Sequence, residues 1–182
     1  MFIYISGDIK EIHKNSLFVE TNNGLAFEIF VPCVTRYEVG SKIKLYLFTQ
    51  IHNESINLYG FENWDSYKLF KLLNDVNGIG PKTALQILKN IDIDRFISYV
   101  YYSKIEELSK ISGVGSKADK IIAELKSKIR GFKVTETPYE NVFDALIALG
   151  YDSINVSKVL NTLKPNLDEN EAIKIAIRGL AK

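Results

Sequence analysis

Two stretches decide the fold of the central part of this chain: NGIGPKTA, residues 77–84, and SGVGSKAD, residues 112–119. Each has two glycines around one apolar residue, a lysine two residues later, and a following pattern typical of an amphipathic helix. The first glycines, Gly78 and Gly113, are 35 residues apart, the length of one helix–turn–helix unit with its connector. We therefore predict that the chain uses the same small turn twice.

Both turns are suited to hold a phosphate. Glycine lets the backbone adopt a positive φ and lets a ligand approach closely. The helix that follows presents unpaired amides and the positive end of its dipole, while Ile79 and Val114 are expected to anchor the turns in the core. Such a turn contacts the DNA backbone without reading the bases. The predicted contacts are Gly78, Ile79, Gly80, Lys82 and Thr83 in the first turn, and Gly113, Val114, Gly115, Ser116, Lys117 and Lys120 in the second.

Charge is distributed unevenly along the chain. The formal net charge is only +1, but residues 63–131 hold twelve Lys/Arg against eight Asp/Glu. The flanking segments 1–62 and 132–182 carry −2 and −1 respectively. The basic surplus therefore coincides with the two glycine turns, as expected for a segment that binds nucleic acid.

Several other classes of site are excluded by the residue types present. Cys33 is the only cysteine and there are two histidines, so the chain has no internal disulfide and no thiol cluster for zinc. We predict no metal, no cofactor and a reducing cytoplasmic location. The turns follow helices rather than strands and lack a third glycine, which excludes a dinucleotide fold.

Residues 1–62 show the alternation of short strands. Asn23-Gly24 is a strong hairpin signal, and Ile43, Leu45 and Leu47 alternate with polar neighbours. About five strands in this length favour a small OB-like barrel. Its large apolar residues exceed what such a barrel can bury and suggest a subunit interface; they include Phe18, Phe30, Tyr46 and Phe48.

From Asp65 to Arg130 the apolar period becomes helical. We expect Asp65 or Ser66 to cap the first helix and Pro81 to open the second. Residues 116–130 are predicted to form the longest helix of this segment. The sequence therefore predicts an all-helical domain over 63–130.

The C-terminal part divides into a linker and a small bundle. Residues 131–140 lack a period and contain glycine, proline and threonines. Residues 141–182 predict three helices, the first of which ends at Gly150. A bundle this small leaves apolar side chains exposed, so we predict a domain that binds a partner protein.

The glycine turns resemble helix–hairpin–helix DNA-binding motifs. With the barrel ending in NLYGF and the C-terminal ALIALGYDSINVSKVL, the whole chain resembles the RuvA family, the Holliday-junction-binding subunits of the bacterial RuvAB branch-migration complex. The resemblance implies a multi-domain α+β protein with an OB-like barrel (1–62), a tandem helix–hairpin–helix domain (63–130) and a UBA-like three-helix domain (141–182). Compared with the family, the second turn is one residue shorter.

The resemblance also implies partners and further functional residues. The family forms homotetramers, or octamers of two tetramers, on four-way junction DNA, and recruits RuvB, a hexameric ATPase, beside a RuvC-like resolvase. The family places two adjacent acids at the junction centre; here Glu54 is the only acid, beside Asn53. Contacts with the motor are expected at Leu146, Leu149, Tyr151 and Ile177.

Two other functions fit part of the pattern. A helix–hairpin–helix repair enzyme requires a carboxylate beyond the hairpin, for which Asp92 and Asp94 are candidates. A protein-interaction adaptor would use the glycine turns only as structural corners. The first reading would require catalysis by this chain, whereas the RuvA resemblance implies a DNA-binding subunit whose ATPase activity resides in its partner.

Overall fold

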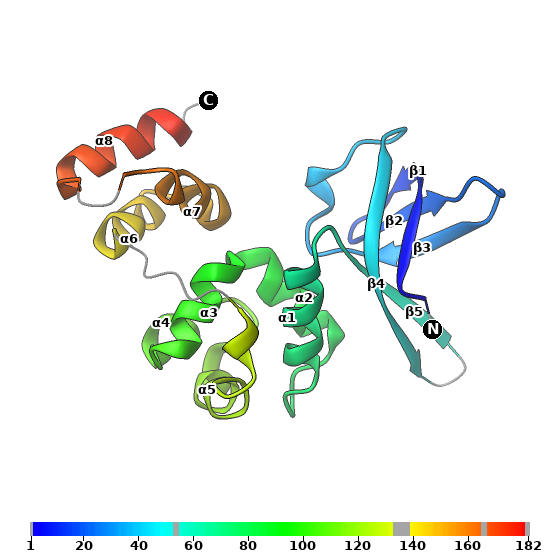
Figure 1. Cartoon of the computed structure of the whole chain (residues 1–182), viewed down its shortest axis with the longest axis horizontal. Coiled ribbons are helices and arrows are strands. Elements are labelled where there is room, and N and C mark those ends of the chain that lie inside the picture. The colour runs from blue at the N-terminus through cyan, green and yellow to red at the C-terminus, as the bar shows by residue number, and fades with distance from the viewer. Residues whose placement is uncertain (1, 53–54, 133–138, 165–166, 181–182) are drawn as a thin grey trace. The chain divides into compact units, whose positions relative to one another are not determined.

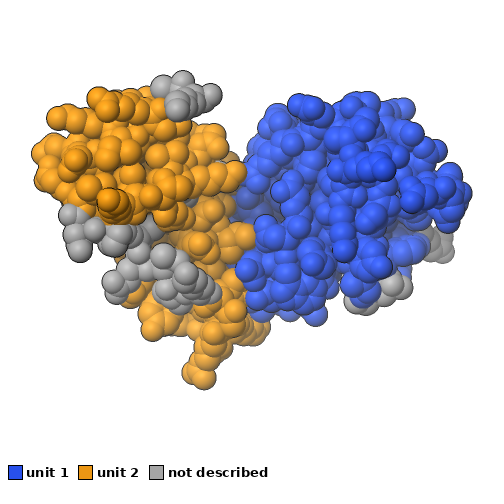
Figure 2. Space-filling model, turned by 45° about the horizontal axis from the view of Figure 1, so that its top comes forward, with its two compact units in different colours: residues 1–89 blue, residues 90–182 orange. Residues whose placement is uncertain are grey.

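The structure is a computed structural model that describes residues 2–52, 55–132, 139–164 and 167–180. The chain forms two compact units, Met1–Lys89 and Asn90–Lys182, which are coloured separately in Figure 2. Among the described helices, none is both long and apolar enough to cross a membrane.

Five strands of the first unit close into a barrel (Figure 1). The order around the barrel is β1-β2-β3-β5-β4, in which β3 and β5 pair in parallel and all other neighbours are antiparallel. The strands are β1 (Tyr4–Ile12), β2 (Ser16–Glu20), β3 (Ala26–Phe30), β4 (Lys42–His52) and β5 (Ser55–Phe61). This arrangement confirms the predicted five-stranded barrel.

The alternation in the sequence correctly identified the barrel interior. Leu45 and Leu47 of β4 are buried, whereas Lys42 and Lys44 on the opposite face are exposed. The predicted β2–β3 hairpin is also present, with Gly24 at a φ of 79°. Its loop is wider than a two-residue turn, because the Thr21 amide donates to the Leu25 carbonyl at 2.8 Å.

Helix α1 (Trp64–Asn74) packs on the barrel and covers part of its aromatic surface. The Phe70 ring lies 5.3 Å from that of Phe48 and 5.2 Å from that of Tyr59, and Phe30 contacts Tyr59 at 5.6 Å. Phe30 and Phe48 therefore already have partners within the chain. Both rings stay half-buried, so their place in a subunit interface stays a prediction.

The cap of α1 differs from the prediction. The Asn63 side chain accepts a hydrogen bond from the Ser66 amide at 2.8 Å, so the cap is Asn63 and not Asp65 or Ser66. Asparagine is among the preferred N-cap residues, so the sequence contained the correct signal two residues earlier. Helix α2 (Pro81–Asn90) begins at the expected proline.

Three helices and two short 3-10 turns form the first part of the second unit. They are α3 (Ile93–Tyr101), α4 (Ile105–Ser109) and α5 (Ala118–Leu125), with 3-10 turns at Gly115–Lys117 and Ile129–Gly131. The predicted long helix over 116–130 is therefore wrong. Its apolar stripe at Ile121, Leu125 and Ile129 is buried as expected, but the backbone tightens to 3-10 geometry at both ends.

The last three helices match the predicted C-terminal bundle. They are α6 (Glu140–Ala148), α7 (Ser153–Asn161) and α8 (Glu169–Leu180). Gly150 has a φ of 89° and ends α6 as predicted. Its amide donates to the Ile147 carbonyl at 2.9 Å, and the Tyr151 amide donates to the Leu146 carbonyl at 3.2 Å. These two bonds are the pair that defines a Schellman cap.

Candidate nucleic-acid interface

The first glycine turn connects α1 to α2. Gly78 has a φ of 87°, in the region that favours glycine, and Ile79 is only 3% exposed. The Ile79 amide donates to the Val76 carbonyl at 2.9 Å, which closes the turn. The predicted role of Ile79 as an apolar anchor is confirmed.

The N-terminus of α2 follows this turn directly. The first helical bond joins the Ala84 amide to the Gly80 carbonyl at 2.9 Å. The amides of Lys82 and Thr83 precede that bond, and an N-terminal turn of this kind presents such amides to an anion. The Lys82 side chain is exposed on the same turn and adds a positive charge. This arrangement is compatible with the predicted phosphate site, which stays a prediction.

The backbone at Gly80 differs from that at Gly78. Its φ is outside the left-handed region, so the positive φ that glycine permits is not used at this position. The following Pro81 favours an extended conformation for residue 80. Apart from chain neighbours, no described heavy atom lies within 4 Å of a Cβ built on Gly80. A side chain here would therefore obstruct only an external ligand.

The second turn repeats the geometry of the first. Gly113 has a φ of 97°, and Val114 is 2% exposed. The Val114 amide donates to the Ile111 carbonyl at 3.0 Å. This bond is equivalent to the Ile79–Val76 bond of the first turn, 35 residues earlier. Both turns have a glycine with positive φ, a buried apolar residue and an equivalent hydrogen bond. The prediction that the chain uses the same turn twice is confirmed.

The two turns differ in the residues that follow. Gly115 has a φ of 51° and opens a 3-10 turn, in which the Lys117 amide donates to the Val114 carbonyl at 3.1 Å. The Ala118 amide donates to the Gly115 carbonyl. These amides are therefore engaged within the chain, and the side chains of Ser116 and Lys120, both exposed, are the groups best placed to reach a phosphate.

The structure distributes the predicted DNA contacts over both units. The first turn, Gly78–Thr83, lies in the first unit, and the second, Gly113–Lys120, lies in the second. Glu54 and the neighbouring Asn53 lie outside the described residues, so the role of Glu54 stays a prediction.

The predicted motor contacts have different exposures. Leu149 is 67% exposed at the C-terminal end of α6, and Tyr151 and Ile177 are half-buried. Leu146 is fully buried in the bundle core, so its assignment as a contact residue needs correction. It stabilises the bundle and does not present a surface to a partner.

Two lysines missed by the sequence analysis lie near the first turn. Lys14 and Lys89 line a groove together with Lys82. Lys89 could have been found from the sequence, because it follows Lys82 by seven residues and therefore lies on the same face of the predicted helix. Lys14 could not have been found in this way, because it comes from the turn between β1 and β2.

Models of known protein families match almost the whole chain. The RuvA N terminal domain model matches residues 1–60, the SAM-like Helix-hairpin-helix tandem model matches residues 70–127, and the RuvA, C-terminal domain model matches residues 137–181. The three matches occur in the predicted order.

Curated relatives are similar over their full length. Proteins from Acetivibrio thermocellus and Thermotoga petrophila are each 33% identical to this chain, and one from Acholeplasma laidlawii is 31% identical. In all three cases the alignment covers 100% of this chain and 100% of the relative. Each relative is named "Holliday junction branch migration complex subunit RuvA". With the barrel, the paired glycine turns and the C-terminal bundle in place, this chain belongs to the RuvA family.

Proposed function

We propose that this chain binds four-way DNA junctions through their sugar–phosphate backbones, independently of base sequence. The observation that carries the proposal is the repeated turn, with matching φ at Gly78 and Gly113 and matching hydrogen bonds at Ile79 and Val114. Each turn places a helical or 3-10 N-terminus beside exposed polar or basic side chains, which suits phosphate and offers nothing that reads a base edge.

Membership of the family supports a proposal for the assembly. Its named relatives are subunits of a branch migration complex. We infer a tetramer, or an octamer, on the junction, with residues 1–62 as its centre, 63–130 as the DNA-binding domain and 141–182 as the recruiting domain for a RuvB-like hexameric ATPase. A RuvC-like resolvase is a further partner in this proposal.

The chain is proposed to be a non-catalytic subunit. Asp92, the carboxylate considered for a repair enzyme, caps α3 by accepting hydrogen bonds from the amides of Asp94 at 3.0 Å and Arg95 at 3.4 Å. Within the described ranges, no group of three or more His, Cys, Asp or Glu side chains could hold a metal ion. These observations favour a capping role for Asp92.

A gel-shift comparison of a four-way junction with linear duplex tests the proposal. Both should be measured between 50 and 200 mM salt, with two unrelated arm sequences. We expect junction preference, equal affinity for both sequences, and a steep loss of affinity with salt as counterions compete for the backbone. Binding that is insensitive to salt, or that differs between the arm sequences, would contradict the proposal.

The role of the C-terminal bundle needs a separate test in the full-length chain. Leu149→Ser removes an exposed apolar side chain and should leave the fold and junction affinity unchanged. If Leu149 is a central contact, its loss costs about 2 kcal/mol of motor binding, roughly 30-fold. The matched control is Ile175→Ser, which removes an exposed apolar side chain from α8. Equal motor stimulation by the wild type and both variants would contradict the assignment of Leu149.

A further inference from the structure

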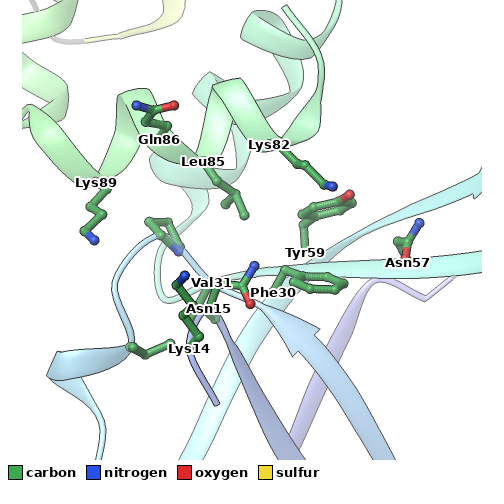
Figure 3. A pocket seen from close by; sticks show the side chains of 12 residues that line it. Lys14, Asn15, Phe30, Val31, Asn57, Tyr59, Lys82, Leu85, Gln86 and Lys89 are labelled. Carbon is green, nitrogen blue, oxygen red and sulfur yellow. The ribbon is translucent and has the colours of Figure 1, made fainter. Parts of the chain in front are cut away.

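A basic concavity of the first unit lies between α2 and the barrel. It has a volume of about 520 Å³. Figure 3 shows Lys82 and Lys89 extending from α2 on one side and Lys14 from the β1–β2 turn on the other. The lining residues are Lys14, Asn15, Phe30, Val31, Pro32, Val34, Asn57, Tyr59, Lys82, Leu85, Gln86 and Lys89.

The charge in this groove has one sign. Three lysines line it, and no lining residue is acidic. In the described part of the chain, no carboxylate forms an ion pair with Lys14, Lys82 or Lys89. All three side chains are exposed. Three like charges around one concavity repel each other, and an anion that enters the groove relieves this repulsion.

The spacing along α2 fits a polymeric anion better than a single phosphate. Lys82, Leu85, Gln86 and Lys89 lie on one helical face, at positions i, i+3, i+4 and i+7. Seven residues of α-helix span about 10 Å. This length exceeds the size of one phosphate, so Lys82 and Lys89 can contact different phosphates of the same strand.

The floor of the groove can pack against sugar rings. The Phe30 and Tyr59 rings lie 5.6 Å apart, and the Tyr59 hydroxyl donates to Gln50 Oε1 at 3.3 Å. Burial raises the pKa of Tyr59, so its hydroxyl stays neutral and adds no negative charge to the groove. Asn15 and Asn57 supply amide groups at the rim.

We propose that this groove binds the backbone of the DNA strand that leaves the first glycine turn. Lys82 belongs to both sites, so a strand held at Gly78–Thr83 continues along α2 over Lys14 and Lys89. The proposal rests on the proposed function and extends it, since it adds a second row of phosphate contacts from residues outside the hairpin.

The test is the salt dependence of junction binding by the full-length Lys14→Gln/Lys89→Gln variant. Each lysine removed from a phosphate reduces the slope of log K against log salt by about 0.9, so the double variant should lose about 1.8 per subunit. If the two affinities converge at 1 M salt, this slope change corresponds to roughly 60-fold weaker binding per subunit at 0.1 M salt. The Lys14→Arg/Lys89→Arg variant retains the charge and should restore the slope.

Lys71→Gln is the matched control, because Lys71 is exposed on α1 and does not line the groove. Its slope should equal that of the wild type. If the double variant retains the wild-type slope while Lys82→Gln loses affinity, the groove proposal is overturned and the hairpin function stands. If the wild type shows no junction preference, both fail. If the double variant binds junctions normally but changes mass in light scattering, the groove is a subunit contact, which also overturns the proposal.

Discussion

Replacement of Gly80 by valine should separate DNA binding from folding. The Gly80 backbone is outside the left-handed region, and its Cβ position is open, so the chain itself can accept a side chain there. Loss of glycine at a helix N-cap lowers the free energy of unfolding by about 0.5–1 kcal/mol. The valine also reduces the conformational freedom of the unfolded chain, which raises the free energy of unfolding by about 0.4–1 kcal/mol. The free energy of unfolding should therefore change by less than about 1 kcal/mol.

The effect on binding should be much larger. A side chain at position 80 prevents a phosphate from reaching the amides of Lys82 and Thr83. Each hydrogen bond to a charged group contributes about 1.5–3 kcal/mol, so the loss of even one of the two corresponds to roughly 10- to 150-fold in affinity. Fluorescence anisotropy with a labelled junction measures this loss, and thermal unfolding of the same samples measures stability.

A control variant is available in the same chain. Gly131→Val also introduces a side chain into open space without a positive φ, and it lies outside both turns. It should bind junctions with wild-type affinity. If Gly80→Val is folded and retains full affinity, no ligand approaches Gly80, and the first turn is only a structural corner.

Three further predictions address the rest of the chain. Gly150→Ala should destabilise the C-terminal bundle by about 1–2 kcal/mol, because its φ of 89° is unfavourable for alanine; chemical denaturation measures this, and an unchanged midpoint would contradict the cap. Glu54→Gln should tighten binding to junction and duplex alike and reduce the ratio of the two affinities, because it removes like-charge repulsion at the proposed junction centre; an unchanged ratio in a gel shift would make Glu54 an ordinary surface residue. Light scattering at micromolar concentration should give the mass of a tetramer or octamer, and a stable monomer would contradict the proposed assembly.

Short-range patterns predicted most of the fold. Alternation identified Leu45 and Leu47 as interior barrel residues, and Pro81 and Gly150 correctly marked the start of α2 and the end of α6. These signals depend on neighbours along the chain. The anchoring of Ile79 was also predictable, since an apolar residue between two glycines of a turn has few alternatives to burial.

Features that depend on distant contacts could not be predicted in this way. The sequence does not show that Phe70 of α1 packs against Phe48 and covers part of the aromatic surface of the barrel. The conformation of Gly80 depends on the following proline, whereas Gly78 has a positive φ. Lys14 and Lys89 are 75 positions apart, and only the tertiary fold of the first unit brings them to one groove.

The central claim is that the protein binds the DNA backbone independently of base sequence. Hydroxyl-radical footprinting of junctions tests it most directly, since the reagent attacks the sugars rather than the bases. The full-length protein should protect the same backbone positions on the arms of two junctions of unrelated sequence, and Gly80→Val should remove protection at one set of positions. Protection that moves with the base sequence, or that is unchanged in the Gly80 variant, would contradict the account.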